Sequence, residues 1–138
     1  MIKYFYHSNA VIFVLTALTF FAIPHLIDDF LFGIPAEFGL TNQGAQILSG
    51  WFSVILVLIF VLVARDRPIG YYLSAFLGAF LALAVILRHI PRMTQPGPYW
   101  SGWFSELLIY GVGVSGIVTL GLSVMALTKK SGLHESFS

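Results

Sequence analysis

The stretch Ile47–Ala64, ILSGWFSVILVLIFVLVA, decides the fold class of this chain. It holds no charged side chain, and the basic turn Arg65–Gly70, RDRPIG, follows it directly. Because an α-helix rises about 1.5 Å per residue, roughly 20 apolar residues cross the hydrocarbon core of a bilayer. The stretch therefore predicts a transmembrane helix that ends at a charged turn.

Three more segments have the length and the apolar composition of membrane spans. We expect the four transmembrane helices at about Ala10–Phe32, Ile47–Ala64, Ile69–Leu87 and Leu107–Leu127. Unbroken apolar runs favour helices over the alternating pattern of β-barrel strands. Since the connections are short, the sequence predicts one all-α domain over residues 1–138, an integral membrane four-helix transmembrane bundle, with a short polar tail at 131–138.

The composition excludes several classes of function. Hydrophobic residues make up 58% of the chain and charged residues 9%, whereas soluble proteins average about 25% charged residues. The lack of Cys excludes disulfide scaffolds and Cys-ligated metal centres, and a net charge of +1 offers no basic stripe for nucleic acid. No nucleophile–base pattern, phosphate-binding glycine loop or HExxH helix is present. The composition thus predicts the lipid bilayer as a partner and argues against soluble enzymes.

The distribution of Lys and Arg sets the expected orientation, because basic residues in short loops stay on the cytoplasmic side. One side of a four-pass topology holds Lys3, Arg65, Arg67, Lys129 and Lys130. The other side, which we call the outer side, holds Asp28, Asp29, Glu37, Arg88, Arg92 and Glu106, with Trp51, Trp100 and Trp103 at the expected headgroup level. We therefore expect a multi-pass protein of the cell (plasma) membrane with both termini in the cytoplasm. The first segment lacks a small-x-small cleavage site, so we expect it to be retained.

Small residues predict which helices pack together, since membrane helices associate where backbones approach closely. Gly70, Ser74, Gly78 and Ala82 form a stripe on the third span, and the fourth span carries its own glycines, Gly116 among them. We expect these two spans to be in close contact. The sequence SGWFS also occurs twice, at Ser49–Ser53 and Ser101–Ser105. Two parallel helical-hairpin repeats explain this recurrence, and so does chance combined with a shared need for a capping Ser and an interfacial Trp.

Ionisable residues at the outer ends of the spans are the candidate site. His25, Asp28 and Asp29 share one face of the first span at helical spacing, while Arg88, His89 and Arg92 end the third span. Glu106 begins the fourth. Charges at membrane depth usually pair, so we expect Arg88 or Arg92 to bridge to Asp28 or Asp29. The predicted ligand-binding residues are His25, Asp28, Asp29, Arg88, His89, Arg92 and Glu106.

Several interpretations of this cluster stay open. It is either purely structural, closed by salt bridges and headgroup contacts, or it binds a ligand. A quinone or a lipid-like molecule fits the residue types best, with imidazole meeting a carbonyl and Arg meeting an anionic group. A divalent metal on His25, Asp28, Asp29 and His89, or a haem between His25 and His89, is less compatible with the nearby arginines and acids. We predict no metal, and the sequence names no cofactor.

The layout of the chain resembles the DoxX-like family of small four-helix membrane proteins. The resemblance rests on His25 and Asp28, the loop Gly33–Gly39, the entry Leu48–Gly50, the basic turn Arg65–Gly70, and His89. It departs at Trp51, Phe52 and Ser53, where members of the family often carry an acidic residue. The resemblance implies a membrane role near quinone chemistry.

The sequence therefore predicts a small multi-pass membrane protein that binds a quinone or lipid-like ligand at the outer His/Asp/Arg cluster. Such a protein serves a membrane redox system whose electron carrier lies in a partner. The alternative is a non-catalytic accessory subunit of a larger membrane complex, or a homo-oligomer, that docks through smooth Gly/Ala faces. The residues alone do not indicate a particular reaction.

Overall fold

A computed structural model describes residues 2–97 and 99–135, and every regular element in this part of the chain is a helix. The long helices are α1 (Ile2–Leu31), α3 (Asn42–Ala64), α4 (Pro68–Ala84) and α6 (Trp103–Glu135). Three short elements join them, namely α2 (Ile34–Glu37), the π-helical turn η1 (Val85–His89) and α5 (Ile90–Met93). The predicted all-α membrane fold is confirmed.

Four helical segments are long and apolar enough to cross a membrane. They run over Ser8–Leu31, Asn42–Ala64, Pro68–Met93 and Trp103–Lys129, so each predicted span is present and begins earlier than predicted, and the last two also end later. α3 begins early because the Thr41 side chain caps it, accepting a hydrogen bond from the amide of Gly44 at 3.0 Å. α6 continues to Glu135, which places most of the predicted polar tail inside the helix, and residues 136–138 lie outside the described residues.

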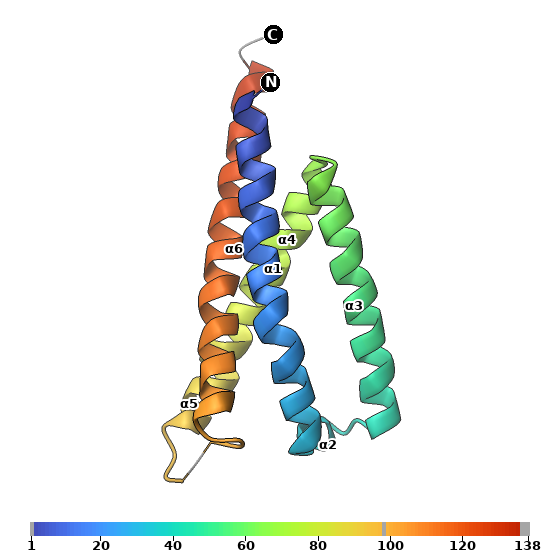
Figure 1. The fold of residues 1–138 in the computed structure, drawn as a ribbon, viewed down its shortest axis with the longest axis vertical. Coiled ribbons are helices and arrows are strands. Elements are labelled where there is room, and N and C mark those ends of the chain that lie inside the picture. The colour runs from blue at the N-terminus through green and yellow to red at the C-terminus, as the bar shows by residue number, and fades with distance from the viewer. Residues whose placement is uncertain (1, 98, 136–138) are drawn as a thin grey trace.

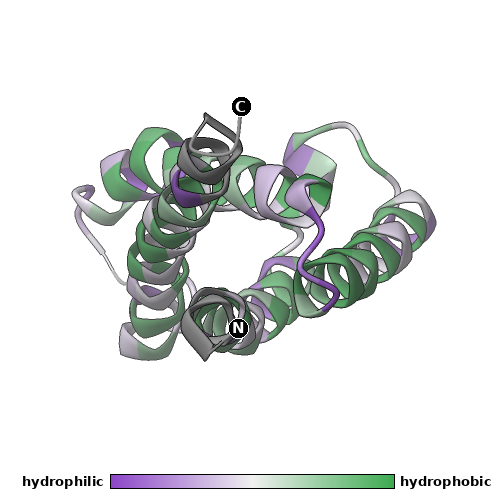
Figure 2. Ribbon diagram, turned by 90° about the horizontal axis from the view of Figure 1, so that it is seen from above, coloured by the Kyte–Doolittle hydropathy of each residue, from purple (hydrophilic) through white to green (hydrophobic). Residues whose placement is uncertain are grey.

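The long helices form a bundle in which α1 and α6 lie side by side and antiparallel (Figure 1). The N-terminal end of α1 and the C-terminal end of α6 lie at one end of the bundle, and α2 and α5 lie at the other (Figure 1). We call the second the α2–α5 end. Much of the ribbon of the long helices has the green of hydrophobic residues in Figure 2, and large side chains such as Phe13, Trp51 and Phe76 are exposed. Such an apolar outer surface is suited to lipid.

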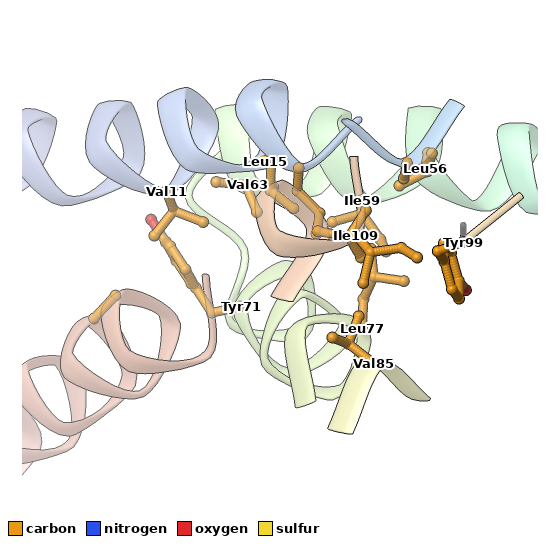
Figure 3. Packing of buried hydrophobic residues seen from close by; sticks show 14 residues of the cluster. Val11, Leu15, Leu56, Ile59, Val63, Tyr71, Leu77, Val85, Tyr99 and Ile109 are labelled. Carbon is orange, nitrogen blue, oxygen red and sulfur yellow. The ribbon is translucent and has the colours of Figure 1, made fainter. Parts of the chain in front are cut away.

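Buried apolar side chains from all four long helices meet between them (Figure 3). Leu15 of α1, Ile59 of α3 and Ile109 of α6 are almost completely buried. Tyr71 near the start of α4 is also buried, and its hydroxyl donates a hydrogen bond to Asp66 at 2.6 Å. This bond fixes α4 to the basic turn that follows α3.

The expected contact between the third and fourth spans is confirmed at two glycines. A Cβ atom added to Gly78 of α4 lies 2.5 Å from the carbonyl oxygen of Gly116 in α6, and one added to Gly116 lies 2.9 Å from the carbonyl oxygen of Gly78. Each backbone therefore occupies the space that a side chain on the other helix needs. α3 meets α4 in the same way at the basic turn, where Gly70 lies against the backbone of Val63.

The two SGWFS segments do not occupy equivalent places in the fold. Ser49–Ser53 lies inside α3, where Gly50 is helical, whereas Ser101–Ser105 spans the turn before α6 and its first residues. Gly102 there has φ 72°, a left-handed conformation that Gly adopts without strain. Thr41, not Ser49, caps α3. The described structure therefore does not support reading the two segments as matching parts of two hairpin repeats.

Replacing Gly78 with Ala is expected to destabilise the bundle by about 1–3 kcal/mol, because the new methyl group meets backbone atoms that have no room to move. Unfolding titrated with SDS in mixed micelles measures the change. Gly121→Ala is the matched control, since no atom lies within 4 Å of a Cβ at that position. Equal stability of the two variants would contradict the packing described here.

Candidate functional site

The side chain of Asp28 joins α1 to the start of α6. Asp28 is only 4% exposed, and both of its carboxylate oxygens accept hydrogen bonds, one from the hydroxyl of Ser101 and one from that of Ser105. Ser105 also accepts a bond from the backbone amide of Ser101 at 3.0 Å. Carboxylate hydrogen bonds are stronger than neutral ones, so these contacts fix the turn that precedes α6 against α1.

The fixed turn carries two aromatic residues that pack on two histidines. His25 of α1 and His89 of η1 touch edge to face, with ring centroids 4.9 Å apart. The Trp100 ring stacks over His25 at 6.2 Å and meets the edge of His89 at 5.7 Å. Trp100 has φ 36°, an uncommon left-handed conformation for a residue with a bulky side chain. Its ring therefore lies inside the cluster and not only at the headgroup level where we expected it.

Tyr99 completes this group through His89. Its phenol oxygen lies 2.6 Å from Nδ1 of His89, within hydrogen-bond distance. Burial raises the pKa of the Tyr99 phenol, and the Asp29 carboxylate nearby raises it further, so the phenol keeps its proton at neutral pH. A buried imidazole and a protonated phenol thus share one hydrogen bond.

His25 and Asp29 form a second polar pair beside the first. Nδ1 of His25 and Oδ1 of Asp29 are 3.7 Å apart, one helical turn from each other on α1. Both atoms are buried, and neither hydrogen-bonds to any residue that the structure describes. Buried polar atoms without a partner are rare in folded proteins and call for an explanation such as a ligand or an ordered water.

The expected salt bridges to Asp28 or Asp29 are wrong, because both arginines pair with Glu37. Nη2 of Arg88 lies 2.6 Å from Oε2 of Glu37, and Nη1 of Arg92 lies 3.2 Å from Oε1. Asp28 is satisfied by the serine hydroxyls instead. The arginine side chains remain about half exposed at the α2–α5 end, and the Arg92 guanidinium also lies 5.9 Å from the centroid of the Trp100 ring.

An apolar cavity of about 430 Å³ lies beside the two polar pairs, between α1, α2, α3 and α4. Its walls are mostly aliphatic and aromatic, and Leu48 and Phe52 of α3 are among them. His25, Asp29 and His89, together with Ser49 of α3, supply the polar part of the lining. A second cavity of about 280 Å³ shares Asp29 and His89 and contains the arginines and Glu37.

Six of the seven predicted site residues come together at the α2–α5 end of the bundle. Asp28 is buried, His25, Asp29 and His89 are half-buried beside it, and Arg88 and Arg92 form the exposed part. Glu106 is half-buried in the first turn of α6 and lines neither of the two cavities.

The geometry also bears on the metal and haem interpretations. No three His, Asp or Glu side chains among residues 2–97 and 99–135 are arranged to hold a metal ion. The rings of His25 and His89 touch each other, which leaves no space between them for the plane of a porphyrin. The described arrangement is therefore less suited to either group than to an organic ligand in the neighbouring cavity.

Sequence reasoning missed the residues that complete the cluster. These are Glu37, Phe38, Tyr99, Trp100, Ser101 and Ser105. The serines were interpreted as part of a repeat and Trp100 as a headgroup anchor, because a sequence alone does not reveal which loop folds back over a helix end. The available signal was the pair Tyr99 and Trp100 directly before Ser101, with Ser105 four residues further along.

Comparisons with protein-family models, with curated proteins and with solved structures found no match. The resemblance to the DoxX-like family thus stays a prediction.

Replacing Ser105 with Ala is expected to cost about 1–3 kcal/mol of unfolding free energy, because it leaves a buried carboxylate oxygen of Asp28 without its donor. SDS titration again provides the measurement. Ser53→Ala serves as the control, since the exposed hydroxyl of Ser53 bonds only to the carbonyl of Ser49 in its own helix. If Ser105→Ala proved as stable as Ser53→Ala, the link between α1 and α6 through Asp28 would be unimportant.

Proposed function

We propose that this multi-pass membrane protein binds a quinone or a lipid-like ligand in the 430 Å³ cavity, with His25, Asp29 and His89 meeting the polar group. The observation that carries the proposal is the position of this apolar cavity against two buried polar atoms that lack a hydrogen bond, Nδ1 of His25 and Oδ1 of Asp29, which lie 3.7 Å apart. Ligand sites in proteins are commonly cavities of about 300–1,000 Å³ with apolar walls and a few convergent polar groups. The cavity falls within this class.

A quinone is the ligand type that the lining favours. Its ring and isoprenoid tail match aliphatic and aromatic walls such as those of Leu48 and Phe52. Its carbonyl oxygens accept hydrogen bonds from imidazole, and its reduced form donates them to imidazole or carboxylate. His89 in this wall is itself within hydrogen-bond distance of Tyr99, which lies behind it and lines neither cavity. In this role the chain serves a membrane redox system in which a partner supplies or accepts the electrons.

The basic residues support an orientation for this site. Lys3, Arg65, Arg67, Lys129 and Lys130 belong to the segments at the other end of the bundle, and cytoplasmic loops are richer in such residues. The cavity then opens near the outer leaflet of the plasma membrane, and both termini are cytoplasmic. The resemblance to the DoxX-like family supports the same link to quinone chemistry.

The second candidate is an accessory subunit of a larger membrane complex. That interpretation requires Gly/Ala faces that are free to dock onto a partner. Gly78 and Gly116, however, pack against each other inside the bundle. Gly50 and Gly121 lie in open space, so two small-residue positions remain for a partner helix or a second copy. The unpartnered polar atoms next to the cavity favour the ligand-binding role over this one.

His25→Ala is expected to weaken binding of a short-chain ubiquinone analogue about tenfold, because one hydrogen bond to the ligand is lost. Quenching of tryptophan fluorescence in nanodiscs follows the binding, since Trp100 lies against both histidines. Phe52→Ala, which removes a cavity wall, is expected to weaken binding as well.

Phe76→Ala is the matched control, because Phe76 is 70% exposed on the lipid-facing surface and lines neither cavity. Its binding constant should equal that of the unmodified protein. Failure of the analogue to bind saturably, or identical affinities for Phe52→Ala and Phe76→Ala, would argue against the proposed site.

A further inference from the structure

The short helix α2 covers one side of the 430 Å³ cavity. Ile34 and Pro35 of α2, and Phe38 directly after it, belong to the cavity lining. Gly33 precedes α2 with φ 70° and Gly39 follows it with φ 68°. Glycine populates this left-handed region without strain and leaves it as readily. The segment Gly33–Gly39 therefore has the form of a small lid with a glycine at each end.

One acidic side chain fastens this lid to the rest of the bundle. Glu37 forms ion pairs with Arg88 and Arg92 of the η1–α5 segment. The Arg88 guanidinium also lies over the Phe38 ring, 4.9 Å from its centroid. These contacts reach from the lid to the helix segment on the far side of the second cavity. As all three charged side chains are partly exposed, the fastening is weak enough to be reversible.

The arginine pair is incompletely neutralised by this contact. A single carboxylate, that of Glu37, forms ion pairs with both guanidinium groups, while the Asp29 carboxyl lies elsewhere in the lining of the same cavity. Each guanidinium offers a planar fork of donors that fits the oxygens of a phosphate group, and a phosphate engages two such forks at once. The 280 Å³ cavity that contains both arginines provides space beside them.

The position of Arg88 and Arg92 in the membrane indicates the source of the phosphate. Arg88 and Arg92 lie in the last turns of the membrane-spanning segment Pro68–Met93. Long cationic side chains at the end of a span reach the headgroup layer, where the phosphates of the lipids are concentrated. A soluble phosphate has no comparable local concentration there.

We propose that Arg88 and Arg92 form a binding site for the phosphate of an anionic phospholipid, and that Glu37 occupies this site in its absence. When the lipid phosphate binds, the Glu37 carboxylate leaves the arginines and α2 moves away from the cavity. The anionic lipid thereby regulates access to the cavity. The effect on a ligand rests on the proposed function, whereas the movement of the lid does not.

Cysteine labelling measures the lid directly, because the chain contains no Cys of its own. Ala45→Cys places a thiol in the cavity wall, where Ala45 is 5% exposed, and Ser49→Cys provides a second position in the same wall. A membrane-impermeant maleimide is added to protein in nanodiscs of phosphatidylcholine, with or without phosphatidylglycerol. Phosphatidylglycerol is expected to raise the labelling rate at both positions about fivefold.

Two variants separate the parts of the proposal. Glu37→Gln removes the fastening, so labelling at Ala45→Cys should be fast in both lipid compositions. The double variant Arg88→Gln/Arg92→Gln should also label fast and should no longer respond to phosphatidylglycerol. Gln43→Cys, at an exposed position at the start of α3, is the matched control and should label at one rate throughout.

Slow labelling of Glu37→Gln, or a rate at Ala45→Cys that ignores phosphatidylglycerol, would overturn the proposal. An equal rise with inorganic phosphate in phosphatidylcholine alone would overturn the assignment to a lipid and assign the site to soluble phosphate. Because labelling needs no bound quinone, a lipid-sensitive lid with no quinone binding would contradict the proposed function and leave this inference standing.

Discussion

Asp28 is buried at the α2–α5 end of α1, where its carboxylate accepts hydrogen bonds from Ser101 and Ser105. A charged group at this depth is tolerated only with partners, and both of its oxygens have one. The contact determines where the turn before α6 lies, and with it the positions of Tyr99 and Trp100. Those two rings then enclose His25 and His89, so the whole polar cluster depends on this one carboxylate.

The cavity has a different origin, in the unequal packing of the helices. Glycines bring α4 against α6 at Gly78 and Gly116, and Gly70 brings the start of α4 against the end of α3. From that turn α3 and α4 diverge toward the α2–α5 end, as Figure 1 shows. The space between them is lined by residues from the first half of α3, such as Ala45 and Phe52. Close contact at one end and divergence at the other thus leave an apolar space beside the polar cluster.

Most of the fold was predictable because long apolar runs such as Ile47–Ala64 identify membrane-spanning helices in the sequence. The convergence of His25, Asp29 and His89 followed from their places at the ends of two spans. The partners of the arginines did not follow, since Glu37 reaches them from a short helix between two left-handed glycines that apolar periodicity does not detect. The π-helical turn Val85–His89 also changes the register of the side chains after it, which helical spacing does not anticipate.

The central claim is that the cavity beside His25 and Asp29 holds an amphipathic ligand. Native mass spectrometry of the protein extracted from its own membrane in mild detergent, with an absorption spectrum of the same sample, tests this most directly. The account predicts a bound species with the mass and ultraviolet spectrum of a quinone, or the mass of a lipid, that is lost in His25→Ala while the protein stays folded. A protein that carries no ligand and co-purifies with larger subunits would contradict this claim. The polar cluster would then be a structural feature of an accessory subunit.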